Sequence, residues 1–123
     1  MGKTYGKLYN WFAVNDPRGL CPAGWHIPSS VEFQKMADYL GGDTLAGAKL
    51  KSAGGAGFEA LPAGYRFFTG KYNHLGNFAC FWTSSEANSV FAWLRALYFT
   101  NDLEFYFKFF GKKNGFSCRC LKD

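Results

Sequence analysis

The C-terminal run Cys118-Arg119-Cys120 is the part of the chain best suited to thiol chemistry. Residues two apart on a strand share one face, so the two thiols could bind a metal ion or form a redox pair. No histidine-rich motif accompanies them, although zinc sites draw on three or four such ligands. The alternative for Cys118 is a small buried apolar side chain, and the sequence favours it over a metal site.

The two histidines and the Ser-Ser-Glu run are the other candidates for chemistry. His26 and His74 lack the His-x-x-x-His spacing of metal ligands. Ser84 and Ser85 precede Glu86, but a serine nucleophile needs a base that is itself held by an orienting group. Nothing marks either histidine as that base, and Ser-Ser-Glu is typical of a turn or helix cap. We therefore predict no catalytic residue and a structural role for His26.

Cofactor binding is also not expected. The glycine-rich run at residues 54–57 does not follow a strand and open a helix, as a phosphate-binding loop does. It is typical of a flexible turn. Acidic residues are few and dispersed, so no carboxylate pair can be argued.

Four cysteines allow three complete pairings, and their spacing leaves all three open. A bridge from Cys21 to Cys120 would join the two ends of the domain. In the chain-entropy model, closing a loop of roughly 100 residues stabilises the fold by about 4.7 kcal/mol. A disulfide would indicate an exported protein, and reduced thiols would indicate the cytosol or a phage product.

One main helix is predicted near residues 29–40. Ser29 or Ser30 can cap its N-terminus, Glu32 lies in the first turn, and Gly41-Gly42 ends it. A shorter helical turn or an irregular arm is expected at residues 46–50.

Strands are predicted by alternating apolar residues, first at residues 5–14 and then mainly in the C-terminal half. The later candidates are residues 64–69, 80–84, 92–99, 103–110 and 115–121. Turns are expected at 101–102 and 111–115, so the second half reads as an antiparallel meander. The fold class is α+β, in a single domain that spans residues 1–123.

Aromatic side chains make up 20% of the 123 residues, with 14 Phe, 7 Tyr and 4 Trp. Both faces of the strand predicted at 92–99 are largely apolar. A sheet packed on one helix leaves one face in water, so we expect some of these rings at the surface. Exposed aromatic clusters favour binding, and aromatic residues dominate interaction hot spots.

The formal net charge of +5 is spread along the chain, with no basic run longer than two residues. This pattern favours a solvated positive surface over nucleic-acid binding. No stretch approaches the roughly 20 apolar residues of a membrane helix, so no membrane insertion is expected. The N-terminus lacks a signal-peptide pattern, so the chain is expected to be soluble and untargeted as given.

The sequence resembles the Fibrobacter succinogenes major paralogous domain family, which is widespread in Bacteroidetes and gut metagenomes. The resemblance covers nearly the whole chain in order. It is carried by the runs GKLYNWFAVNDPRGLCPAGWHIPSSVEF, YLGG, AGAKLK, FEALPAGYRF, FWTSSE and KKNGFSCRCLKD.

The resemblance implies a C-type-lectin-like fold, related to formylglycine-generating enzymes and to the variable proteins of diversity-generating retroelements. In that fold the helices and joined termini form a scaffold, and the sheet and loops near the C-terminus form the ligand face. Cys21 and Cys120 match scaffold cysteines and are thereby the disulfide candidate. The matching scaffold aromatics are Trp25, Trp82 and Trp93; we expect Trp82, Trp93 and Leu97 inside.

The chain departs from the family at positions that commonly hold tyrosine, asparagine or serine. Its replacements there, which are the predicted ligand-binding residues, are Phe78, Phe81, Phe91, Leu94, Ala96, Phe99, Phe105, Phe107, Phe109 and Phe110. Most of these rings are expected on or beside the ligand face. The substitutions, with Cys118 in place of valine, fit the diversification of a retroelement variable protein. An ordinary paralogue with an apolar face is the alternative.

These observations predict a non-catalytic recognition module whose partner is a protein ligand on a host or cell surface. The family favours a cell-surface, secreted or phage-associated location. The calcium motifs of sugar-binding C-type lectins do not occur, which disfavours calcium-dependent sugar binding. Two alternatives stay open: an oxidase of the formylglycine-generating type, motivated by Cys118 and Cys120, and a purely structural surface domain.

Overall fold

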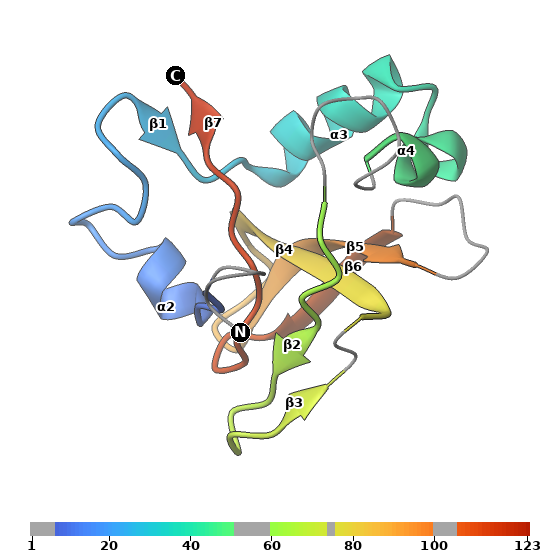
Figure 1. The fold of residues 1–123 in the computed structure, drawn as a ribbon. Helices are drawn as coiled ribbons and strands as arrows, with labels where there is room; N and C mark the ends of the chain where they lie inside the picture. Colours follow the sequence, from blue (N-terminus) through green and yellow to red (C-terminus); the bar gives the residue numbers. More distant parts are fainter. Residues whose placement is uncertain (1–6, 51–59, 74–75, 100–105) are drawn as a thin grey trace.

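The computed structural model describes residues 7–50, 60–73, 76–99 and 106–123. Few helices and small antiparallel sheets make up this part of the chain (Figure 1), which confirms the predicted α+β class. The elements in order are α2 (Trp11–Val14), β1 (Trp25–His26), α3 (Ser30–Tyr39), α4 (Asp43–Leu50), β2 (Tyr65–Arg66), β3 (Tyr72–Asn73), β4 (Phe78–Glu86), β5 (Phe91–Tyr98), β6 (Tyr106–Gly111) and β7 (Leu121–Lys122). No described helix is long and apolar enough to cross a bilayer.

The predicted main helix is confirmed as α3, and a capping box defines its start. The Ser29 hydroxyl accepts from the Glu32 N–H at 3.2 Å, and the Glu32 carboxylate accepts from the Ser29 N–H at 3.0 Å. The helix ends at Tyr39 with Leu40 as its C-cap, and Gly41 and Gly42 follow with φ angles of 105° and 96°, which suit glycine best. The helical turn expected at residues 46–50 is the second half of the eight-residue helix α4.

The strand predicted at residues 5–14 is wrong within the described residues, because the chain turns into helix α2 after one bridge. Tyr9 pairs with Phe116 through two backbone hydrogen bonds of 2.8 and 2.9 Å. The Asn10 side chain then accepts from the Ala13 N–H at 3.1 Å and caps the helix. A local cap therefore overrides the alternating pattern of this segment.

The predicted meander is confirmed for three strands, which pair antiparallel in the order β4-β5-β6. The pairing of β4 with β5 shifts register between Trp82 and Glu86. The predicted strand at 103–110 is confirmed from Tyr106 onward. The turn expected at residues 101–102 lies outside the described residues.

The strand predicted at 115–121 does not continue the meander. After the predicted turn at 111–115, the chain leaves β6 and bridges three other segments at Gly115, Phe116 and Ser117. It then ends in β7, which pairs with β1. The strand predicted at 64–69 shortens to β2, which pairs with the unpredicted β3. Alternation identified these segments as extended but did not identify their partners.

The three-stranded sheet has a hydrophobic core on each face. In Figure 1, α3 and α4 lie on one side of the sheet, while α2 and β2 lie toward the other. The first core contains Trp11, Val14, Ile27, Tyr65, Phe78, Cys80, Trp82, Ala92, Leu94, Ala96 and Phe116. The second contains Phe33, Ala37, Ala46, Leu50, Ala60, Ala79, Phe81 and Leu97. The expectation of one wet face is therefore wrong, because a second layer covers much of it.

The expected disulfide between Cys21 and Cys120 is present, with the two Cα atoms 5.9 Å apart. It links the loop before β1 to the residue before β7, beside the β1–β7 strand pair. The other two cysteines, Cys80 and Cys118, are free thiols.

Candidate functional site

Three aromatic rings form an exposed cluster at the β4–β5 turn end of the sheet, which we name the aromatic patch: Phe91, Trp93 and Phe109. Trp93 and Phe109 are cross-strand partners, and their ring centroids lie 5.3 Å apart at 81°. Phe91 and Phe109 meet at 5.5 Å and 71°. Both contacts are edge to face, a favoured geometry for aromatic pairs. The side chains are 53% exposed at Phe109 and 36% at Phe91, so the patch presents rings in fixed positions to solvent.

A cavity of about 500 Å³ adjoins the aromatic patch and shares Phe91 with it. Its apolar wall includes Phe12, Phe68 and Val90, all of which are exposed. The complete lining is Phe12, Phe68, Ser89, Val90, Phe91, Phe110, Gly111, Lys112, Lys113 and Asn114. The aromatic patch and the cavity therefore meet at Phe91.

The charged side chains that line this cavity are basic. The Lys112 ammonium donates to the Glu86 carboxylate at 2.6 Å and lies 4.7 Å from the centre of the Trp11 ring. This pairing accounts for a lysine that is almost completely buried. Lys113 is exposed, and the described lining of the cavity contains no carboxylate. The rim therefore carries positive charge beside apolar walls.

Four of the predicted ligand-binding residues are buried, so their expected surface position is wrong. Phe78, Leu94 and Ala96 lie in the first core, and Phe81, only 5% exposed, lies in the second. The physical reason is that α3 and α4 cover one face of the sheet while Tyr65 and Phe116 pack on the other.

The remaining predicted residues divide into three groups. Phe91 and Phe109 are exposed, as expected. Phe99 and Phe110 are half-buried and pack against the cores. Phe105 and the side chain of Phe107 lie outside the described residues.

The interior positions expected for Trp82 and Leu97 are confirmed, because both side chains are fully buried. The indole N–H of Trp82 donates to the Tyr9 carbonyl at 2.8 Å, which satisfies its one donor. The interior position expected for Trp93 is wrong: its side chain is half-buried and packs edge to face against the exposed Phe109 in the aromatic patch. Trp25 is also exposed.

Sequence reasoning missed Phe12 and Phe68, although a signal was present for each. Phe12 follows Trp11 directly, and Phe68 follows Phe67. Neighbouring residues in a helix or strand point to different sides, so a pair of adjacent aromatic residues signals that one ring can lie outside the core. In both pairs the second residue is the exposed one.

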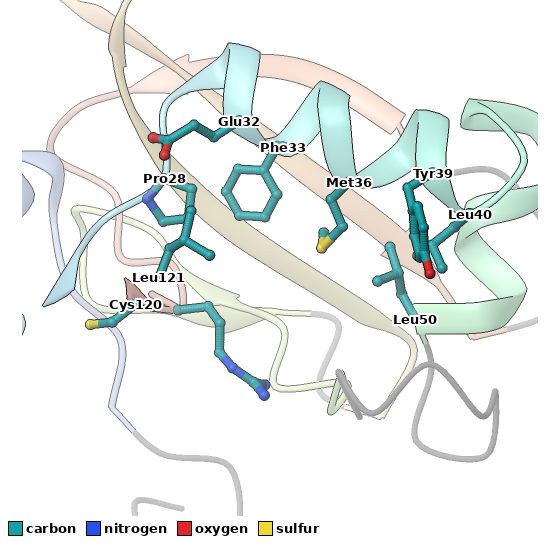
Figure 2. Close-up of a pocket in the computed structure, with 10 residues that line it drawn as sticks. Pro28, Glu32, Phe33, Met36, Tyr39, Leu40, Leu50, Cys120 and Leu121 are labelled. Atoms are coloured by element: carbon teal, nitrogen blue, oxygen red, sulfur yellow. The ribbon is translucent and has the colours of Figure 1, made fainter. Parts of the chain in front are cut away.

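A second hollow of about 350 Å³ lies between α3 and the C-terminal segment, and Figure 2 shows its lining. Phe33, Met36 and Leu50 contribute apolar atoms, and Glu32 stands at one end of the labelled row. Tyr39, at the other end, is 89% exposed. Of the predicted ligand-binding residues that the structure describes, none lines this hollow.

The thiols do not form the Cys118-x-Cys120 pair that metal or redox chemistry would need. Cys120 is bonded to Cys21. Burial raises the pKa of Cys118 to about 12 and that of Cys80 well above its ordinary value, so both stay protonated at neutral pH. Among the described residues, no cluster of His, Cys, Asp and Glu side chains could hold a metal ion.

His26 is held by carboxylates rather than by a serine hydroxyl. Its Nδ1 lies 2.6 Å from Asp123 and its Nε2 lies 2.8 Å from Glu32. The hydrogen bond to Asp123, followed by that to Glu32, raises the pKa of His26. The Ser85 hydroxyl instead accepts from the Ser30 N–H at 3.0 Å. These contacts agree with a structural role for His26, while His74 lies outside the described residues. The Ser-Ser-Glu run forms the end of strand β4 rather than a turn, and its Ser85 hydroxyl accepts at the start of α3.

Comparison with known proteins gives one match. A family profile described as the Fibrobacter succinogenes major domain matches residues 1–122. No curated protein and no solved structure matches the chain.

Proposed function

The chain belongs to the Fibrobacter succinogenes major domain family, and from this premise we propose that it is a non-catalytic recognition module that binds a protein ligand through the aromatic patch. The observation that carries the proposal is the exposure of Phe91 and Phe109 as rings ordered by mutual contact. A ring that is already fixed loses little conformational freedom on binding, and aromatic residues supply a large part of interface energy.

The surroundings of the patch support recognition rather than catalysis. The adjoining cavity has aromatic and aliphatic walls and a lysine rim, which suits a small number of anchoring side chains. No pair of nucleophile and base lines it. The alternative of a formylglycine-generating oxidase loses its motive, because Cys120 is bonded to Cys21 rather than free beside Cys118.

A C-type-lectin-like fold is part of the proposal. Two features support it: the pairing of β1 with β7, which holds the C-terminal segment beside the segment that leads into α3, and the disulfide beside that pair. The sheet β4-β5-β6 would then carry the ligand face. A disulfide-bonded domain is typical of oxidising compartments, which supports display outside the cytosol.

Diversification by a retroelement is proposed only for the outward positions. A random change at Phe91 or Phe109 alters the surface, whereas a random change at Leu94 or Ala96 alters the packed core. A reverse transcriptase gene and a near-identical template repeat beside the gene would support diversification. The absence of both in close relatives would remove it without affecting the proposed binding.

The experiment that tests the function is a selection from a phage-displayed library of random 12-residue peptides. Wild-type protein is the target, and the Phe91→Ser/Phe109→Ser double variant is the counter-target. We expect clones that bind the wild type and lose binding to the variant. Clones that bind both equally, or no clones at all, would favour the purely structural alternative.

A further inference from the structure

Among the described residues, the outer edge of β6 is the open edge of the central sheet. The strand order β4-β5-β6 places β4 and β6 at the two sides. The side of β4 is covered by parallel bridges from Gly64 to Ala79 and from Ser117 to Phe81. In the described chain no segment is paired with the outer side of β6. An uncovered edge of this kind can pair with another chain.

The register shows which backbone groups face that edge. The Lys112 N–H donates to the Val90 carbonyl at 2.9 Å, and Gly111 is the partner of Phe91. Hydrogen-bonded and non-bonded pairs alternate along an antiparallel ladder, so Phe110 bonds to β5. The N–H and C=O of Phe109 therefore point away from β5, toward the open edge.

The usual protections of an edge strand are missing from β6. Its pairing with β5 is continuous from Tyr106 to Gly111, without a bulge, and it contains no proline. Its one lysine, Lys108, donates to the Tyr98 hydroxyl at 2.7 Å and so lies across the sheet face. Exposed edges are commonly blocked by such charges or bulges, and here neither blocks the edge.

We propose that β6 accepts an extended acidic peptide as a fourth strand, with an apolar side chain against Phe109 and a carboxylate near Lys113. This inference rests on the proposed function, because it names how the ligand meets the aromatic patch. Backbone pairing would supply affinity, and the patch and cavity would supply specificity. Charge selects the occupant: the rim at Lys113 is basic, and two copies of the chain, each with a formal charge of +5, repel one another.

A pair of substitutions at one position separates backbone pairing from ring contact. Phe109→Ala removes the ring and keeps the outward N–H, whereas Phe109→Pro removes both. Proline is tolerated on an edge strand when its missing N–H faces outward. With 12-residue peptides selected on the wild type, we expect Phe109→Pro to bind at least about fivefold more weakly than Phe109→Ala, from the loss of one hydrogen bond. Lys113→Glu should also weaken binding, and Lys113→Arg should retain it.

Amide hydrogen exchange on the wild type gives a second readout that does not depend on the variants folding. Peptide binding should slow exchange at the Phe109 amide. Equal peptide affinities of the Phe109→Ala and Phe109→Pro variants, together with unchanged exchange at the Phe109 amide, would overturn strand addition. The proposed binding through the aromatic rings would be unaffected by that result. Peptides that bind the Phe91→Ser/Phe109→Ser variant as tightly as the wild type would overturn the proposed function itself. If the Phe109→Ala variant forms dimers in the absence of peptide and the Phe109→Pro variant does not, the edge binds a second copy of the chain. That result would overturn the proposal of a peptide ligand.

Discussion

The Nδ1 of His26 lies 2.6 Å from the carboxylate of Asp123, which joins β1 to the residue that follows β7. The other ring nitrogen faces Glu32, which belongs to the capping box of α3. Carboxylates only accept, so the imidazole satisfies both contacts best when both of its nitrogens carry protons. The protonated ring therefore fastens the C-terminal residue to the start of the main helix.

This arrangement predicts a stability that depends on pH. The pKa of His26 is raised, so its contribution is complete below the ordinary value of 6.5 and is lost as pH rises through the folded value. The pKa of Glu32 is lowered, chiefly by the Ser29 N–H, so its contribution is present above 4.5 and is lost in acid. We expect the melting temperature to be highest between these two values. In the His26→Gln variant, the melting temperature should fall less steeply above pH 6.5 than in the wild type. An equally steep fall would contradict the role assigned to His26.

Removal of the Cys21–Cys120 disulfide should destabilise the fold strongly. The cysteines are 99 residues apart in sequence. In the chain-entropy model, a loop of this size corresponds to about 4.7 kcal/mol. Denaturant titration of the Cys21→Ala/Cys120→Ala variant measures the loss. Cys118→Ala is the matched control, because it removes a thiol without opening the loop, and a comparable loss in the control would contradict the prediction.

Phe81 should behave as a core residue. Its side chain packs with Phe33 and Leu97 under α3 and α4. Truncation of a buried phenylalanine typically costs about 3–5 kcal/mol, and a serine hydroxyl at this site would add a desolvation cost. Chemical denaturation of Phe81→Ser should show this loss. A change below about 1 kcal/mol would place Phe81 on the surface after all.

Phe109 and Phe91 should behave in the opposite way. Each serine substitution should change the free energy of unfolding by no more than about 1 kcal/mol, because exposed side chains contribute little. The same substitutions should raise solubility, which can be measured as the highest protein concentration free of precipitate. If the Phe109→Ser variant no longer unfolds cooperatively, the aromatic patch is part of the core and the prediction is wrong.

The difference between Phe81 and Phe109 shows where sequence reasoning succeeded and where it stopped. Helix α3 was predictable because Ser29, Glu32 and the glycine pair are local signals. The strands β4 and β5 were predictable from alternation and aromatic content. Which rings lie under α3 and α4 depends on long-range packing, and both faces of β5 are apolar, so the pattern alone could not choose between them.

The candidate site followed the same division. Phe91 and Phe109 were predicted as ligand-binding residues, and the structure places them together with Trp93 in one exposed cluster. The approach of Phe12 and Phe68 to the same cavity depends on contacts between distant segments. Fold-level pairing brings those segments together, and no local spacing in the sequence encodes it.

The most direct test of the central claim is calorimetric titration of a selected 12-residue peptide into three proteins of matched stability. These are the wild type, the Phe91→Ser/Phe109→Ser variant and Tyr39→Ser, which removes an exposed ring from the other hollow. Loss of two hot-spot rings, at about 2 kcal/mol each, predicts an affinity at least about 100-fold weaker for the double variant. Tyr39→Ser should bind like the wild type. Equal affinity for all three would contradict recognition through the aromatic patch.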